Sequence, residues 1–232
     1  MAGMLHKLGI LFYQDADKTL DQVCREKGID AEKVFRHFEL LRKSQDFDLS
    51  QLSHYPIEIL VSILRHSHQL FIKQNLPFLF QTISEMDETR FYNPEIAADL
   101  KTVFPIFAED FIRHIYEEKD TLFDYIQFLL DSTRSIGNPG KLFFRMKAHG
   151  IQHFAMHHEG HDNEMAGIRE LTGNYSMPAD ADLFTTILYR ELQDFEHQLK
   201  QHALIENQLL LPKALRLENE VRWRLDQTRY LN

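Results

Sequence analysis

Cysteine and tryptophan are scarce in this 232-residue chain, which has one cysteine, Cys24, and one tryptophan. A single thiol cannot form an internal disulfide or a thiolate metal cage, and such cysteine usage is expected of a reducing compartment. The chain also lacks a run of 18 apolar residues and a basic leader followed by an apolar stretch, so we predict neither a membrane span nor a secretory signal. We therefore expect a cytoplasmic protein.

Positive charge is also in short supply, because 26 Lys and Arg residues stand against 35 Asp and Glu, a formal net charge of −9. Phosphate backbones and anionic lipids repel such a surface, so we expect no nucleic acid and no membrane as partner. Histidine, in contrast, is abundant, with 13 residues. Without thiolates, a metal site has to be built from imidazole and carboxylate, the donors that suit iron, zinc and manganese.

Apolar residues recur at spacings of three and four, and alternating strand patterns are almost absent, so the predicted fold class is all-α. Breaks rich in glycine, proline and asparagine separate long periodic segments, which is typical of a helix bundle. Two shorter helices that begin at Thr or Asp caps are expected before them, within residues 17–45. A charged last stretch, 213–230, is expected to cap the bundle or to pack on a partner. The long segments span residues 56–86, 94–132, 141–172 and 180–209.

One charged pair occurs twice on these segments, in "HIYEEKDTLF" and in "HALIENQLLL". Residues four apart share a helix face, so His114 with Glu118, and likewise His202 with Glu206, can direct a nitrogen and a carboxylate toward a common point. Apolar residues follow each pair on the same side of the helix, so we expect the face that carries the His and Glu side chains to pack into the core. Burying an ionised carboxylate without a partner is costly, and a metal cation is the simplest partner.

The alternative is that each pair is a surface contact, which adds only a few tenths of a kcal/mol to helix stability. We favour this alternative for a third pair, His54 with Glu58, because it encloses Pro56 at a helix start. For the other two pairs, apolar residues follow at the same spacing in both segments, which favours a metal site.

Further ligands are expected from the first and third long segments. His68 lies among apolar neighbours, whereas His66 falls about 160° away on a helical wheel, so we predict His68 as the ligand. A core histidine bonded to a backbone carbonyl is the alternative. The third segment carries a ladder of histidines spaced four residues apart. Each step of four residues rotates the side chain by about 40° around the helix axis, so only one or two of these histidines can reach one centre. We predict that His161, followed by Asp162, is a ligand, with His157 in reserve, and that the others are solvated or orient the ligands. The ladder consists of His149, His153, His157 and His161.

These residues make the chain resemble the hemerythrin-like four-helix bundle over residues 60–215. Within that group it is most similar to the family of di-iron proteins for the repair of iron centres, also called regulators of cell morphogenesis and nitric-oxide signalling. The resemblance implies two non-haem iron ions, bridged by an oxo group or by carboxylate, with four histidine ligands and two bridging carboxylates, Glu118 and Glu206. The stretch "LTGNYSMPADAD" is also similar to the sequence pattern of this family. The motif residues are, in chain order, His68, His114, Glu118, His161, Asp162, His202 and Glu206, followed by "NQLLLPKAL".

The residues favour this family over two neighbouring groups. Ferritin-like di-iron proteins use Glu-x-x-His pairs, and no histidine of this chain has a glutamate three positions before it. Hemerythrins that carry oxygen resemble this chain less closely, since they use five histidines with one Glu and one Asp. If His157 joins His161 as a ligand, it supplies a fifth histidine, so oxygen binding stays open.

We predict two domains, a helical N-terminal module at 1–50 and the di-iron bundle with an extra C-terminal helix at 51–232. The module resembles the small domain that often precedes the bundle in the repair family, especially through "KTLDQVCREKGIDAEKVFRHFEL". That family carries a Cys-Cys-Gly-Gly motif just before this stretch, where the present chain has "YQDA". The resemblance therefore does not extend to thiol-dependent iron delivery. Cys24 is expected to be a small buried apolar residue.

The resemblance to the repair family implies a di-iron protein of the nitrosative or oxidative stress response that repairs iron-sulfur proteins. Its expected partners are damaged iron-sulfur proteins or a diatomic ligand, oxygen or nitric oxide, and a homodimer and enzymatic turnover are left open. An alternative is a hemerythrin-like sensor that binds oxygen or nitric oxide without catalysis. A third function class is a helical interaction module with incidental histidines, which the iron content of the protein would distinguish from the other two.

Overall fold

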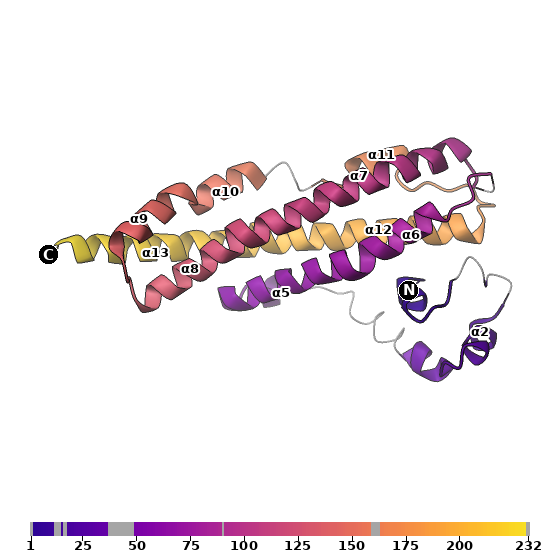
Figure 1. Cartoon of the computed structure of the whole chain (residues 1–232), viewed down its shortest axis with the longest axis horizontal. Coiled ribbons are helices and arrows are strands. Elements are labelled where there is room, and N and C mark those ends of the chain that lie inside the picture. The colour runs from indigo at the N-terminus through magenta and orange to yellow at the C-terminus, as the bar shows by residue number, and fades with distance from the viewer. Residues whose placement is uncertain are drawn as a thin grey trace. The chain divides into compact units, whose positions relative to one another are not determined.

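The structure is a computed structural model that describes residues 2–11, 15, 18–36, 49–89, 91–158 and 163–230. These residues form helices and turns without any strand, so the predicted all-α class is confirmed for the part of the chain described (Figure 1). The α-helices are α1 Ala2–Lys7, α2 Leu20–Glu26, α4 Leu49–Leu52, α5 Ile57–Leu70, α6 Leu76–Ser84, α7 Pro94–Glu118, α8 Asp124–Arg134, α9 Pro139–Ala148, α10 Ile151–His158, α11 Ala166–Leu171, α12 Leu183–Ile205 and α13 Leu211–Tyr230. The π-helices are η1 Phe71–Asn75, η2 Lys119–Phe123 and η3 Glu206–Leu210.

The long predicted segments differ from the observed helices at two places. Helix α12 continues through η3 into α13, so the charged last stretch belongs to one uninterrupted helical run with the segment before it. The third predicted segment is instead broken into α9, α10 and α11. Gly150 separates the first two of these, and a Cβ atom placed there would lie 3.3 Å from the carbonyl oxygen of Met146. A glycine at this point allows a close turn that the periodic pattern alone does not reveal.

The chain packs as two compact units, each formed from several separate stretches of sequence. The N-terminal residues pack together with part of the long helices in unit 1, where His6 Nε2 on α1 lies 2.7 Å from Gln81 Oε1 on α6. The division at residue 50 stays a prediction. Unit 1 comprises Met1–Leu49, Phe71–Ile106 and Met165–His197, and unit 2 comprises Ser50–Leu70, Phe107–Glu164 and Gln198–Asn232.

Local sequence signals account for the first helices of unit 1. Thr19 caps α2, since its hydroxyl accepts from the amide of Gln22 and the Gln22 side chain accepts from the amide of Thr19. Gly28 follows the helix with φ +67°, a left-handed conformation that glycine adopts without strain. Cys24 is fully buried in an apolar cluster, as predicted, together with Ile10, Val23 and Val34.

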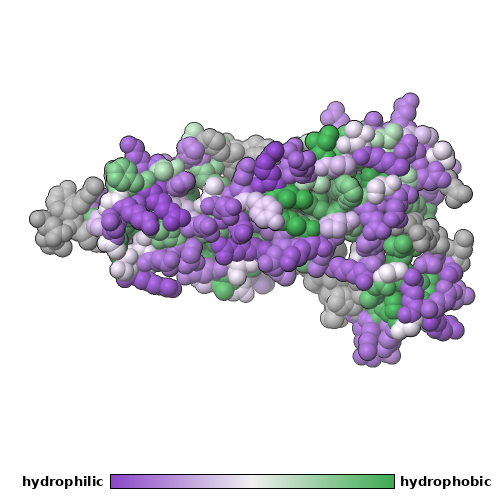
Figure 2. Space-filling model, in the orientation of Figure 1, coloured by the Kyte–Doolittle hydropathy of each residue, from purple (hydrophilic) through white to green (hydrophobic). Residues whose placement is uncertain are grey.

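Helix α13 organises the described part of unit 2, where it packs against α8, α9 and α10 (Figure 1). A buried hydrogen bond of 2.6 Å ties two of these helices together, donated by the hydroxyl of Tyr125 on α8 to the carboxylate of Glu218 on α13. The surface drawn in Figure 2 is mainly hydrophilic, as expected when helices turn their apolar side chains inward. Among the helices described, none combines the length and apolar character that a bilayer crossing requires.

Candidate metal centre

Each of the three π-helices begins at a predicted ligand or within three residues after one. Helix η2 begins one residue after Glu118, η3 begins at Glu206, and η1 begins three residues after His68. π-helical turns are rare and occur frequently at functional sites, because one extra residue in the turn rotates the following side chains relative to those before it. The ligand segments therefore share a local distortion that a regular helix does not have.

The sequence provides a physical reason for each distortion. Leu-Pro follows η1 and η3 directly, at Pro77 and Pro212. A proline ring clashes with the carbonyl four residues before it in a regular helix, and a wider turn moves that carbonyl away. No proline follows η2, but there the hydroxyl of Thr121 donates to the carbonyl oxygen of Glu117 at 2.6 Å and satisfies a main-chain acceptor of the widened turn.

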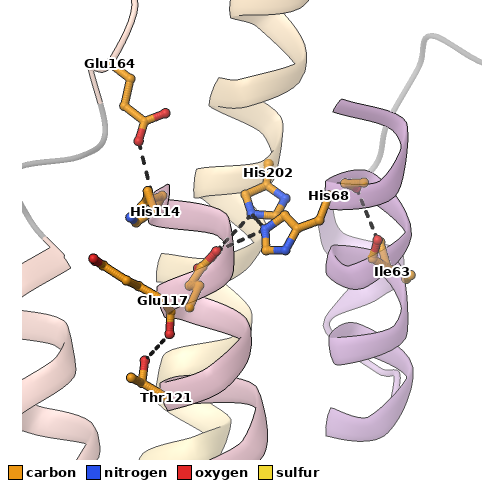
Figure 3. Close-up of polar contacts among 9 residues, drawn as sticks. Ile63, His68, His114, Glu117, Thr121, Glu164 and His202 are labelled. Carbon is orange, nitrogen blue, oxygen red and sulfur yellow. Dashed lines mark hydrogen bonds and ion pairs between the residues drawn. The ribbon is translucent and has the colours of Figure 1, made fainter. Parts of the chain in front are cut away.

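Three of the predicted ligands meet in unit 2. Nε2 of His68 lies 3.0 Å from Oε2 of Glu118 and 3.1 Å from Nε2 of His202, which itself lies 3.9 Å from the same carboxylate oxygen. Figure 3 shows the rings of His68, on α5, and His202, on α12, directed toward each other. Each side chain offers one ligand atom, and these atoms lie within 4.8 Å of one another. Within the described ranges, no other group of this kind is found.

The carboxylates of the two repeated pairs are both buried. Glu118 and Glu206 are each 1% exposed, and His68 is 5% exposed. Removing a carboxylate from water costs several kcal/mol unless positive charge or hydrogen bonds compensate for it. The prediction that the Glu side of each pair faces inward is thus confirmed for these two residues.

Aromatic packing sets the orientation of His68. Its ring stacks on the ring of Phe123, with 5.5 Å between centroids and 24° between planes. The guanidinium carbon of Arg65 lies 5.7 Å from the centroid of the same phenyl ring, which is a cation-π contact. Phe123 is fully buried, so the imidazole stacks against an aromatic ring that is itself fixed by packing.

The remaining predicted ligands are placed differently. His114 lies on α7 one turn before Glu118, and its Nε2 is 3.9 Å from Oε1 of Glu164 (Figure 3). Glu206 lies one turn after His202 but is not part of the group of three. His161 falls outside the described residues, and so does its neighbour Asp162.

Sequence reasoning missed Glu164, whose carboxylate lies near His114. The residue lies in a turn before α11, where no helical register predicts the direction of a side chain. Sequence reasoning also missed the contact of Phe123 with His68, because it joins residues of two different helices.

A cavity of about 310 Å³ reaches the metal-binding candidates from one side. Its lining includes His114 and Glu118 together with Tyr125 of α8. Two histidines of the predicted ladder, His149 and His153, line it as well. The lining of the cavity thus includes one buried carboxylate and two exposed imidazoles.

The donor set fits a divalent transition metal. Two imidazoles and a carboxylate converge, a second buried carboxylate lies one turn from His202, and the sequence stretches that form unit 2 contain no cysteine. Nitrogen and oxygen donors of this kind suit iron, zinc and manganese. The residues present are therefore compatible with the iron that the sequence resemblance implies.

Known proteins with similar sequences support this interpretation. No family model matches the chain. The iron-sulfur cluster repair protein YtfE of Yersinia pseudotuberculosis serotype IB is 26% identical over 163 residues, which cover 70% of this chain and 68% of that protein. The protein of the same name from Yersinia pestis strain Pestoides F is similar to the same extent. The chain is thus a distant relative of the iron-sulfur cluster repair proteins, as the sequence motifs predicted.

Proposed function

We propose that this chain is a non-haem di-iron protein that takes part in the repair of iron-sulfur proteins damaged by nitrosative or oxidative stress. The observation that carries the proposal is the convergence of His68, Glu118 and His202 in a buried site. Similarity to proteins named for iron-sulfur cluster repair supports it. The lone cysteine, which a reducing compartment favours, supports a cytoplasmic location.

Burial and contacts support the roles proposed for the residues that the structure describes, and the sequence resemblance supports the role proposed for His161. His68, Glu118 and His202 would hold one metal position, while His114, Glu206 and His161 would complete the ligand set for two ions. Phe123 keeps the ring of His68 in one orientation, so the imidazole loses little freedom when it binds. The two buried carboxylates would balance the charge of the ions in a site from which water is largely excluded.

Iron bound in this site would supply a redox-active cation with affinity for oxygen or nitric oxide, and the same iron would be the substrate delivered to a damaged cluster. A buried cluster of imidazoles holds such an ion without thiolates, so delivery would not need the cysteine pair that this chain lacks. Because Cys24 is buried, it is poorly placed to exchange with a client protein.

Metal analysis and a repair assay test the proposal together. Anaerobic incubation with Fe²⁺, followed by removal of unbound iron, should leave two irons per chain, and His161→Ala or Glu206→Ala should reduce this number. The loaded protein should then restore activity to a hydratase whose exposed [4Fe–4S] cluster has been damaged by nitric oxide. A chain that holds no iron, or an iron-loaded chain that restores no activity, would contradict the repair function.

A sensor that binds oxygen or nitric oxide is the second candidate function. The cavity that reaches His114 and Glu118 favours it, because a diatomic ligand is small enough to occupy this space. The optical spectrum of the iron-loaded chain should then change reversibly with the gas, without any restored activity of a damaged hydratase. That pair of results would support the sensor over the repair protein.

A further inference from the structure

Three tyrosines of unit 1 contact one another in succession, and we call them the tyrosine chain. The rings of Tyr92 and Tyr189 have centroids 6.0 Å apart and planes at 89°, and their hydroxyl oxygens lie 2.9 Å apart, so one hydroxyl donates to the other. Tyr189 also contacts Tyr175, with 6.2 Å between ring centroids and 74° between ring planes. Tyr92 is 36% exposed, whereas Tyr189 and Tyr175 are buried. The tyrosine chain therefore leads from the surface of unit 1 into its core.

A buried carboxylate forms the inner end of the tyrosine chain. The hydroxyl of Tyr175 donates a hydrogen bond of 2.7 Å to Oε2 of Glu196, which lies on α12. The other oxygen of Glu196 accepts from the guanidinium of Arg169 on α11. An ionised carboxylate is a stronger acceptor and a stronger base than a neutral phenol hydroxyl. The proton of Tyr175 consequently has a better acceptor than the protons of Tyr92 and Tyr189.

The backbone places Tyr175 on this carboxylate at a conformational cost. Gly173, Asn174 and Tyr175 are consecutive residues in the left-handed region, with φ of +59°, +60° and +58°. Glycine adopts this conformation freely, but a bulky residue such as tyrosine rarely does. Strained residues of this kind persist only where surrounding contacts determine them, and they cluster at functional sites. The buried phenol supplies such contacts through its hydrogen bond to Glu196 and its ring contact with Tyr189.

The environment of the buried phenols couples the loss of an electron to the loss of a proton. Burial, and then the hydrogen bond to Glu196, raise the pKa of Tyr175, while burial and then the contact with Tyr92 raise the pKa of Tyr189. Both phenols therefore stay protonated in the folded chain. An oxidised phenol is a strong acid, so it transfers its proton to Glu196 even though Arg169 pairs with that carboxylate. Tyr175 is thus easier to oxidise than Tyr92, whose hydroxyl is bonded to another phenol.

We propose that the tyrosine chain takes single oxidising equivalents from the surface and stores them at Tyr175. A one-electron oxidant such as nitrogen dioxide removes an electron from the exposed Tyr92 and becomes nitrite. The radical then moves through Tyr189 to Tyr175, whose proton passes to Glu196. The net products are nitrite, a phenoxyl radical at Tyr175 and a protonated Glu196, so one electron and one proton have left Tyr175. A reductant such as ascorbate returns one electron along the same path, and Glu196 returns the proton. The inference involves no metal and does not depend on the proposed function.

Nitration of Tyr92 tests the movement of the radical away from the surface. A phenoxyl radical that stays on an exposed tyrosine combines with a second nitrogen dioxide and gives nitrotyrosine. The full chain is treated with peroxynitrite in bicarbonate buffer, which generates nitrogen dioxide, and nitration is quantified by peptide mass spectrometry. Tyr116 on α7 is the internal reference, because it is 50% exposed and does not belong to the tyrosine chain. We expect the ratio of nitration at Tyr92 to that at Tyr116 to rise several-fold in Tyr189→Phe and in Glu196→Gln.

Glu196→Gln is the more stringent of these variants, since it removes the proton acceptor without changing a group that contacts Tyr92. Asp194→Asn is its matched control, because Asp194 is an exposed carboxylate on the same helix, α12. The control should keep the nitration ratio of the unchanged chain. A ratio in Glu196→Gln that equals the ratio in the control would overturn the proposal.

Electron paramagnetic resonance locates the stored radical directly. The full chain is frozen after the same oxidation, at a delay that lets radicals on exposed tyrosines decay. The unchanged chain should show a persistent phenoxyl signal, which ascorbate removes and which Tyr175→Phe lacks. Phenylalanine keeps the ring that packs against Tyr189, so this variant preserves the aromatic contact. A persistent signal of equal size in Tyr175→Phe, or none in the unchanged chain, would overturn the storage of oxidising equivalents at Tyr175.

Discussion

Replacing Glu118 by glutamine tests whether the buried cluster binds a metal through its carboxylate. Glutamine keeps the size of the side chain, so no cavity is created in a position that is 1% exposed. The substitution removes the negative charge 3.0 Å from His68 Nε2. We expect the melting temperature of the metal-free chain to change little, whereas the stabilisation that iron confers should be largely lost.

The magnitude follows from ligand linkage. Iron that binds only the folded chain stabilises it by about 4.1 kcal/mol at a free concentration of about 1,000 times Kd. If loss of the carboxylate weakens binding by about 100-fold, this gain falls to about 1.4 kcal/mol. The difference of about 2.7 kcal/mol corresponds to a decrease of about 5–11 °C in Tm for a chain of this size.

Thermal unfolding by circular dichroism, with and without Fe²⁺ under anaerobic conditions, measures this effect. Glu109→Gln is the matched control, because Glu109 is an exposed carboxylate on the same helix, α7. The control should keep the full increase in Tm on addition of iron. An increase in Glu118→Gln that equals that of the unchanged chain would refute the metal site at this carboxylate.

Three further predictions concern single side chains. His68→Ala should lower the iron content measured by mass spectrometry, whereas His66→Ala should not, because His66 is exposed and lies on a different face of α5; equal loss in both would contradict the choice of ligand. Burial raises the pKa of the Cys24 thiol, so Cys24 should resist alkylation at pH 8 until the chain unfolds, and Cys24→Ser should leave the iron content and repair activity unchanged. Rapid alkylation of the folded chain would contradict this. Burial, and then the hydrogen bond to Glu218, raise the pKa of Tyr125 in the folded chain, so this tyrosine contributes stability that is present below its unfolded pKa of about 10 and decreases as the pH rises above it. Urea unfolding of Tyr125→Phe should show about 1–3 kcal/mol lower stability at pH 8 and a weaker decrease between pH 8 and pH 11; an unchanged pH dependence would contradict the assignment.

The sequence by itself determined the local structure. The apolar spacing predicted helices, the Thr19 cap and Gly28 marked the ends of α2, and the position of Cys24 among apolar residues predicted its burial. The inward direction of Glu118 and Glu206 also followed from the sequence, because residues four apart share a helix face and each pair precedes apolar residues on that face. These features depend on neighbours within about one helical turn, which the sequence lists directly.

The convergence of the ligands depends on the tertiary structure instead. His68 and His202 are 134 positions apart, and their rings meet only because α5 and the α12–η3 segment pack together in unit 2. The pairing of His114 with Glu164 likewise depends on a turn without helical register. The π-helical turns were not predicted, because an extra residue in one turn hardly alters an apolar spacing of three and four. Each extra residue nevertheless rotates the helix that follows relative to the ligand before it, and only the packing of the helices against one another brings ligands from different helices to one point.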